Sequence, residues 1–255
     1  MEFVKFVVFL FASQGLGYDA WLMASKLKGY LKETRRPIYS AAMALPFLCV
    51  YHAGTFLLNT TTINGADALM IRLLGLFSVH SMLTSAAVLA MCFIIWQVRT
   101  RASWTVKSGF LLLAFLESLC FALVLLFGAG WLFTLLSMAP SGALKSIADL
   151  VLYCGAGVYE ELVFRAFLLG FLIWALGRLF NMKQTAAAAT AAVLGALIFS
   201  AFHYIGPAGD AFSFGGFMQR ALGGLYFSAI YVTRGFGITA ASHAIYDIIL
   251  GSILR

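Results

Sequence analysis

The chain has 255 residues, of which 62% are hydrophobic and only 11% are charged, and its formal net charge is +7. A soluble domain has about 25% charged residues, so this composition and the mean hydropathy of +0.95 exclude a soluble globular protein. The basic residues stand in short segments between apolar runs and form no continuous patch. Their placement indicates membrane topology, and we expect no nucleic-acid partner.

Apolar runs separated by polar breaks predict an all-α, polytopic membrane helix bundle of about eight transmembrane helices. A bilayer core about 30 Å thick takes about 20 apolar residues per helix. In chain order the expected spans are 3–24, 39–58, 70–98, 109–138, 146–178, 185–205, 212–233 and 236–253. The first is the weakest, because Gln14 and Asp19 follow its apolar stretch, and it also fits an interfacial helix or a signal-like segment.

The loops between these spans alternate in basic content. Lysine and arginine collect in four segments, which are 25–38, 99–108, 178–184 and 234–236. The alternate loops are 59–69, 139–145 and 206–211, and Lys145 is their single basic residue. The positive-inside rule therefore places the four basic segments in the cytoplasm of a multi-pass protein of the cell membrane. The lipid bilayer is thus an expected partner.

The fifth span carries ionisable residues near its middle, where a charged side chain costs several kcal/mol. Glu160 and Glu161 are adjacent, and Arg165 follows. On a helix Glu161 and Arg165 share a face, whereas Glu160 is turned about 100° away. This spacing indicates that Arg165 holds Glu161 for structure and leaves Glu160 for chemistry. A purely structural network of two acids and one base is the alternative for this motif taken alone.

Histidines occur in two later spans. His203 is near the end of the sixth span, and His243 is in the eighth, four residues before Asp247. At this helical spacing the carboxylate could orient the imidazole or join it at a metal. His52 and His80 are interpreted as hydrogen-bonded packing residues.

Three motifs in this order resemble the CPBP family of intramembrane proteases, which groups CAAX prenyl endopeptidases with bacteriocin-processing and immunity proteins. The motifs are Glu-Glu-x-x-x-Arg at Glu160, Glu161 and Arg165, Phe-x-x-x-His at Phe199 and His203, and His-x-x-x-Asp at His243 and Asp247. The resemblance covers roughly residues 145–253. We therefore expect residues 1–144 to supply N-terminal transmembrane helices of the same membrane domain, and residues 145–255 to supply the catalytic core helices.

The resemblance implies an intramembrane endopeptidase that hydrolyses a peptide bond of a membrane-associated protein or peptide. Glu160 would act as general base on a water molecule that His203 helps to position. His243, with Asp247, would stabilise the oxyanion. Asp247 departs from the commoner asparagine of the family. Because an ionised carboxylate cannot donate a hydrogen bond, Asp247 is expected to orient His243 or to bind a cation.

The remaining motif residues, Glu161, Arg165 and Phe199, would support this site. Two chemical schemes fit the residue set. A glutamate-type peptidase needs no cofactor, whereas a metallopeptidase would hold a divalent metal such as Zn and lower the pKa of bound water. The candidate ligands for that metal are Glu160, His203, His243 and Asp247. The chain has no His-Glu-x-x-His motif, and we prefer the scheme without a metal.

Straight helices would place His203 near the outer end of its span and His243 nearer the cytoplasm. We therefore expect segment 206–210 to break the helix at membrane depth, which is tolerated where backbone lines a cavity or is buried in protein. Tyr204 and Asp210 are then expected near the cavity. Elsewhere Glu117 is a secondary site candidate. Glu117, Arg72 and Arg220 could pair with each other or with lipid headgroups, and for the two arginines snorkelling towards the headgroups is the favoured interpretation.

Two other classes of function compete with the peptidase. The first is a non-catalytic immunity or scaffold protein of the same fold. The second, which is less favoured, is a proton-coupled transporter in which Glu160, Glu161 and Asp247 relay protons, although the chain has no recognisable inverted repeats. Whether a peptidase substrate is prenylated stays open at this point.

Overall fold

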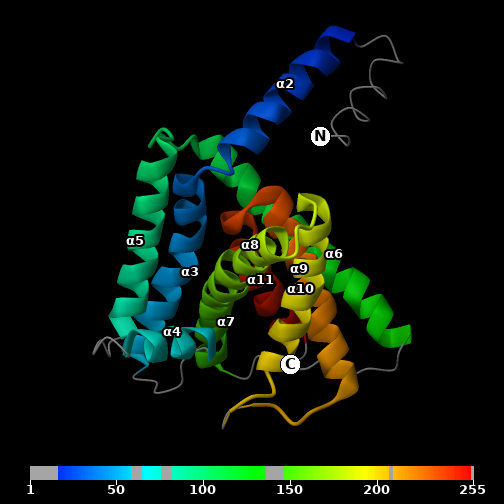
Figure 1. The fold of residues 1–255 in the computed structure, drawn as a ribbon. Coiled ribbons are helices and arrows are strands. Elements are labelled where there is room, and N and C mark those ends of the chain that lie inside the picture. Colours follow the sequence, from blue (N-terminus) through cyan, green and yellow to red (C-terminus); the bar gives the residue numbers. More distant parts are fainter. Residues whose placement is uncertain (1–16, 59–64, 76–81, 136–145, 207–208, 254–255) are drawn as a thin grey trace.

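The computed structural model describes residues 17–58, 65–75, 82–135, 146–206 and 209–253, and every regular element in these ranges is a helix (Figure 1). The first half contains α2 (Gly17–Glu33), α3 (Pro37–Leu57), α4 (Gly65–Gly75), α5 (Met82–Thr100) and α6 (Ser108–Leu135). The second half contains α7 (Ile147–Glu161), the π-helix η1 (Leu162–Leu169), α8 (Gly170–Leu179), α9 (Gln184–Phe202), α10 (Phe214–Arg234) and α11 (Phe236–Ile253). The expected all-α class is confirmed.

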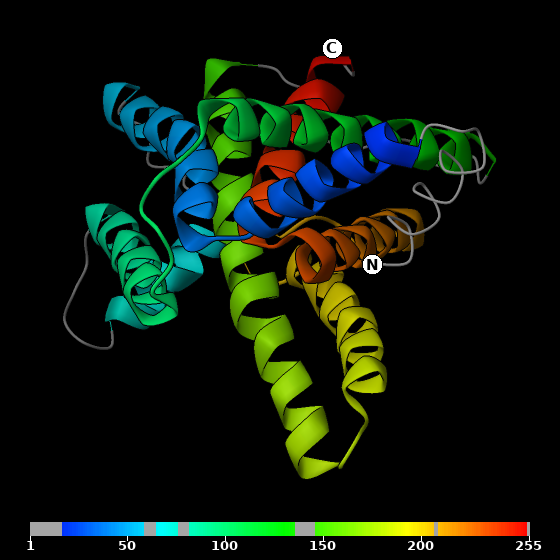
Figure 2. The ribbon, with the colours of Figure 1, turned by 90° about the horizontal axis from the view of Figure 1, so that it is seen from above.

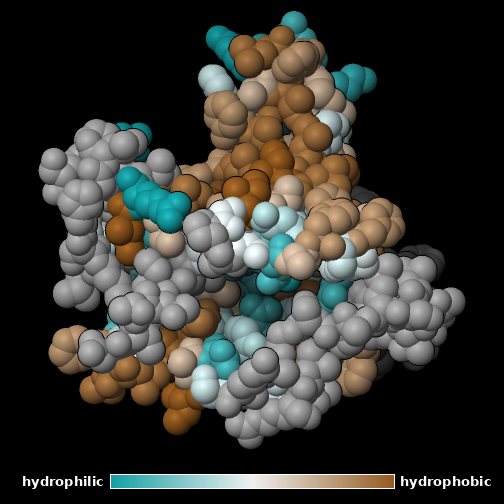
Figure 3. All heavy atoms as spheres, turned by 90° about the horizontal axis from the view of Figure 1, so that it is seen from below, coloured by the Kyte–Doolittle hydropathy of each residue, from teal (hydrophilic) through white to brown (hydrophobic). Residues whose placement is uncertain are grey.

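The outer surface is that of a membrane protein. In the described part of the chain, four helices are long and apolar enough to cross a bilayer, and they are Pro37–Leu57, Ser108–Gly128, Ile147–Leu179 and Gln184–Phe202. Large apolar side chains are exposed around them, among them Phe56 (84%), Phe127 (71%) and Trp174 (58%). Figure 3 shows one face on which hydrophilic side chains gather near the middle, with hydrophobic ones around them. Soluble proteins rarely expose so much apolar surface. The expected total of about eight spans remains a prediction beyond these four.

Three segments expected from the sequence differ from the structure or lie partly outside the described residues. The expected span 70–98 is wrong as a single helix, because α4 and α5 share it and pack against each other. Residues 76–81 between them lie outside the described part. The expected loop 25–38 is also mostly helix, because α2 continues to Glu33. The expected span 3–24 and His80 fall outside the described residues, except that residues 17–24 begin α2.

Local sequence signals set the ends of the helices that carry the polar residues. Ser146 and Asp149 form a reciprocal capping box at the start of α7. The hydroxyl of Ser213 caps α10 by accepting a backbone N–H. Gly235 ends α10 with φ 86°, a left-handed conformation that suits glycine, and α11 begins at the next residue. These signals therefore fix where α7, α10 and α11 begin.

Helices α7 and α11 form the centre of the fold. α11 packs against α7, α6 and α3, while α9 pairs with α10. Figure 2 shows α7, η1 and α8 as one continuous rod, and α9 turns back beside its far end. A buried cluster that includes Tyr51, Val158 and Phe236 joins α3, α7 and α11. The rod and α11 are thereby held in contact along the segment that carries Glu160 and His243.

Gly157 allows α7 and α11 to approach closely. A Cβ atom at this position would lie 2.5 Å from the Cβ and the backbone nitrogen of Ala244. We expect Gly157→Ala to force the two helices apart and to lower the free energy of unfolding by about 1–3 kcal/mol. Thermal unfolding in detergent measures this loss. Gly170→Ala is the matched control, because a Cβ there meets nothing within 4 Å; equal stability of the two variants would contradict the close packing.

Candidate active site

The centre of the polar cluster is Glu161, which is completely buried at the end of α7. Its Oε1 atom lies 2.9 Å from a guanidinium nitrogen of Arg165 and 2.7 Å from Nδ1 of His243. The ion pair predicted between Glu161 and Arg165 is therefore present. The contact with His243 was not predicted, because 82 residues separate the two positions in the chain. It joins α7 to α11.

Arg165 is only 1% exposed and connects η1 to two further helices. Its guanidinium donates a hydrogen bond to the carbonyl oxygen of Gly224 on α10, at 3.2 Å. The guanidinium carbon also lies 4.5 Å from the ring centre of Phe199 on α9 and 5.7 Å from that of Phe227 on α10. A buried charge is tolerated when it is paired and hydrogen-bonded, and Arg165 has such partners.

His243 presents its second ring nitrogen to two carboxylates. Its Nε2 atom lies 3.4 Å from Asp247 and 3.9 Å from Oε2 of Glu160. The Glu161 carboxylate can only accept, so Nδ1 of His243 donates to it and Nε2 faces the other two acids. The ring also stacks on Phe227, with centres 4.5 Å apart. Asp247 was expected to orient the imidazole, but Glu161 makes the shorter contact.

His203 reaches the cluster through Phe199. Its Nδ1 atom lies 3.0 Å from the carbonyl oxygen of Phe199 one turn earlier, and its ring is 4.9 Å from the Phe199 ring. The His243 ring also lies near Phe199, with ring centres 6.4 Å apart. Because a carbonyl only accepts, Nδ1 of His203 donates, and Nε2 of the neutral ring is left as an acceptor. Both histidines therefore lie near one phenylalanine.

The α-helix ends before the segment that follows His203, and the depth of that segment in the membrane stays a prediction. α9 ends at Phe202 and α10 begins at Phe214, and the expected break at 206–210 lies between them. Tyr204 and Asp210 both bind Arg220: the guanidinium donates to the Tyr204 hydroxyl at 3.0 Å and pairs with the Asp210 carboxylate. Arg220 was expected to snorkel, and it forms this local cluster instead. Arg72 is exposed on α4.

Glu117 lies in a separate ion pair. Its carboxylate accepts two hydrogen bonds from Arg234, at 2.5 and 2.8 Å, and one from the Tyr30 hydroxyl. Arg234 also donates to the Thr34 hydroxyl at 3.0 Å. These contacts tie α2, α6 and α10 together. They give Glu117 a structural partner set in place of the site role considered from the sequence.

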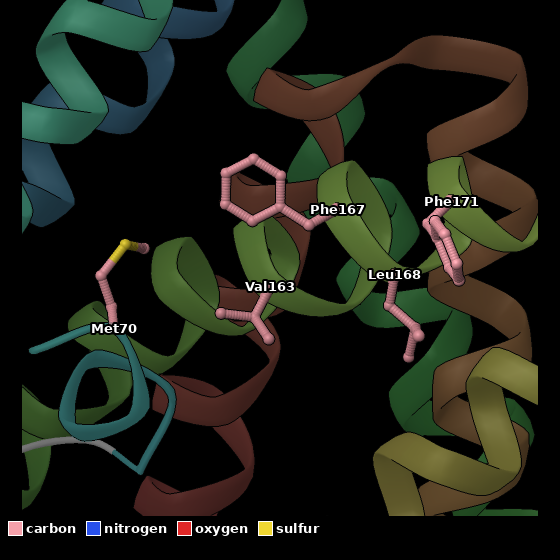
Figure 4. A pocket seen from close by; sticks show the side chains of 5 residues that line it. All are labelled: Met70, Val163, Phe167, Leu168 and Phe171. Atoms are coloured by element: carbon pink, nitrogen blue, oxygen red, sulfur yellow. The ribbon is translucent and has the colours of Figure 1, made fainter. Parts of the chain in front are cut away.

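An apolar pocket of about 290 Å³ lies on the outer side of η1. Figure 4 shows Met70 of α4 on one side of Val163 and Phe167, with Leu168 and Phe171 on the other. None of these side chains is ionisable, so the lining of the pocket includes none of the candidate catalytic residues. Val163 is two residues from Glu161, and the pocket thus adjoins the polar cluster along the chain.

The metal-dependent scheme finds no ready ligand set. Among the residues that the structure describes, no three His, Cys, Asp or Glu side chains are grouped as a metal site. Glu160 and Asp247 both lie on the Nε2 side of the His243 imidazole, and Nδ1 of that imidazole is bound to Glu161.

The comparison with known proteins concerns the same part of the chain. A family model described as Rce1-like, type II CAAX prenyl endopeptidase, matches residues 142–249. This region of the chain is thus similar to Rce1-like proteins. All seven residues of the three motifs fall within it, and the family is one of proteases. The resemblance predicted from the motifs is thus confirmed at the level of the family. No curated protein and no solved structure gives a significant match.

Proposed function

We propose that this protein is an intramembrane endopeptidase that cleaves a membrane-associated protein or peptide, and that Glu160 is its general base. The observation that carries the proposal is that Glu160 on α7 lies 3.9 Å from Nε2 of His243 on α11. Behind them Glu161 and Arg165 form a fully buried support. A base, an imidazole and a fixed second layer are the parts that amide hydrolysis needs.

In the first step, a water molecule attacks the carbonyl carbon of the scissile amide while the Glu160 carboxylate removes a proton from it. His203 would position that water, since Nδ1 donates to the Phe199 carbonyl and Nε2 can accept from the water. General base catalysis of this kind requires the carboxylate to lie within hydrogen-bond reach of the water. Glu160 lies close to His243, the residue that would bind the oxyanion, and this position fits that requirement.

The same step places negative charge on the former carbonyl oxygen. His243 as an imidazolium would donate from Nε2 to this oxyanion while Nδ1 remains bound to Glu161. Asp247, 3.4 Å from Nε2 before the reaction, would hold the imidazole until the substrate arrives. When the tetrahedral intermediate re-forms its C=O bond and the amide C–N bond breaks, Glu160 returns its proton to the leaving nitrogen, and the two fragments leave as a carboxylic acid and an amine.

The pocket beside η1 supports an apolar group on the substrate. Its five lining side chains offer no hydrogen-bonding group, so it fits an aliphatic chain or an apolar side chain. We expect Val163→Phe to fill the pocket and to raise KM by about 10-fold with a smaller change in kcat, because it removes substrate binding without touching Glu160. Steady-state kinetics measure the split. Val193→Phe, at an exposed position on α9, is the control, and a fall in kcat alone would contradict the assignment.

The proposal includes an orientation. The basic segments 25–38, 99–108, 178–184 and 234–236 would face the cytoplasm of a cell membrane that the chain crosses several times. Cysteine labelling from each side of sealed vesicles tests this arrangement: labels at 104 and 181 should react from the cytoplasmic side, and reaction from the opposite side would overturn it.

Purified protein in lipid nanodiscs tests the function. The probe is a synthetic peptide with a prenylated CAAX tail, chosen from the printed name of the family, and the same peptide without the prenyl group is run in parallel. We expect mass spectrometry to detect one new carboxyl terminus in the prenylated peptide. Comparison of terminal peptides from membranes with and without the intact gene extends the search to other substrates. A chain that cleaves neither the peptide nor any membrane protein would contradict the proposal.

A further inference from the structure

The eight residues that follow Glu161 form a π-helix, η1 (Leu162–Leu169), between two α-helices. A π-helix uses i→i+5 hydrogen bonds, and it is rare because the α-helix is usually the more stable form of the same chain. Unfavourable backbone conformations persist only where the surrounding structure over-determines them. Side chains before η1 and within it must therefore hold it in place.

The downstream anchor is Arg165. It pairs with Glu161 inside the helix and donates to the Gly224 carbonyl on α10. Its guanidinium also lies against the Phe199 ring on α9. These contacts fix the rotation of η1 towards α9 and α10, the side on which the polar cluster lies.

The upstream anchor is on the other side of the rod. Tyr159, the residue before Glu160, is completely buried, and its hydroxyl lies 2.8 Å from Nε2 of His52 on α3 and 3.1 Å from the Ser85 hydroxyl on α5. Its ring also meets Tyr51 edge to face, with centres 5.6 Å apart. No step of the proposed chemistry uses this network. It is nevertheless built from three helices around one hydroxyl group.

We propose that Tyr159 is a positioning residue, whose hydroxyl, held by His52 and Ser85, fixes the π-helical register of residues 162–169 and so sets Glu160 and Glu161 against His243. Glu160 and Glu161 lie between the two anchors. Loss of one residue of register would rotate the downstream segment by about 100°, the turn per residue of an α-helix. Arg165 would still share a helix face with Glu161, but it would turn away from Gly224 on α10 and from the Phe199 ring on α9. The kinetic part of this inference rests on the proposed function, whereas the register does not.

Tyr159→Phe tests the anchor, because it removes only the hydroxyl and keeps the ring. We expect kcat to fall by about 10²-fold, the loss typical of a catalytic group displaced by 1 Å, with KM unchanged. Tyr39→Phe is the matched control: Tyr39 is equally buried on α3 and its hydroxyl accepts one hydrogen bond from the backbone of Lys107. The two variants should lose similar thermal stability, and only Tyr159→Phe should lose kcat. Equal kcat for both variants would overturn the proposal.

Two further measurements separate positioning from general stability. His52→Leu should reproduce the fall in kcat, and the double variant with Tyr159→Phe should be no worse than either single variant, because both remove one interaction; additive losses would overturn the assignment. An experimental structure of Tyr159→Phe should have i→i+4 bonding within 162–169, and retention of i→i+5 bonding would also overturn it. This structural result stands even if the wild-type protein cleaves no peptide, so failure of the proposed function and failure of the anchor are distinguishable.

Discussion

Glu160→Gln is expected to lower kcat for peptide cleavage by about 10²–10⁴-fold, the contribution typical of a general base. The amide has nearly the same size as the carboxylate and cannot take a proton from water. Glu160 belongs to the cluster around His243 but not to the ion pair of Glu161 with Arg165, so the fold should be retained. Kinetics with the prenylated peptide, together with thermal unfolding, measure both quantities.

Glu33→Gln provides the charge-matched control, because Glu33 is a partly exposed residue paired with Arg36 at the end of α2. It should leave kcat unchanged. A Glu160→Gln protein that keeps full biological activity would show that hydrolysis is not the function. The non-catalytic scaffold of the same fold would then be the better description.

Arg165→Met is expected to lower the free energy of unfolding by about 3–5 kcal/mol, which is the usual cost of removing one partner from a buried ion pair. Glu161 would remain as a buried carboxylate paired with His243, and its Oε2 atom has no hydrogen-bond partner in the described structure. Chemical or thermal unfolding in detergent measures the loss. A variant as stable as wild type would contradict the burial of this pair.

Glu161→Gln combined with Arg165→Met separates stability from catalysis. Replacing both members of a buried pair is often nearly neutral for stability, so we expect the double variant to recover most of the free energy lost in Arg165→Met. It should be much less active than wild type, because the amide at position 161 carries no charge and holds the Nδ1–H of His243 less firmly than the carboxylate does. Recovery of both stability and activity would mean that Glu161 has no part in orienting His243.

Local spacing in the sequence predicted those parts of the structure that depend on neighbours along one helix. Apolar runs predicted α3, α9 and α11 to within a few residues. The i, i+4 spacing predicted the contact of Glu161 with Arg165, and the order of the three motifs predicted the family that matches residues 142–249. In each case the signal and the contact belong to the same short segment.

Contacts between segments that are distant in the chain could not be predicted from the sequence. The Glu161–His243 bond joins residues that are 82 positions apart, and the Glu117–Arg234 pair joins residues that are 117 apart. The division between α4 and α5 falls within the apolar run 70–98, where Ser78, His80 and Ser81 are polar but carry no fixed charge, so hydropathy alone predicted no break there. The π-helix has no recognised residue pattern, because it depends on the tertiary partners of Tyr159 and Arg165.

The position of a bound substrate is the most direct test of the account. An experimental structure of Glu160→Gln in lipid, trapped with the uncleaved prenylated peptide, would locate the scissile amide. We predict that its carbonyl oxygen lies within hydrogen-bond distance of Nε2 of His243, with the side chain at position 160 and His203 on either side of the reacting carbon. A peptide seated on a surface remote from Glu160 and His243 would contradict the proposed site.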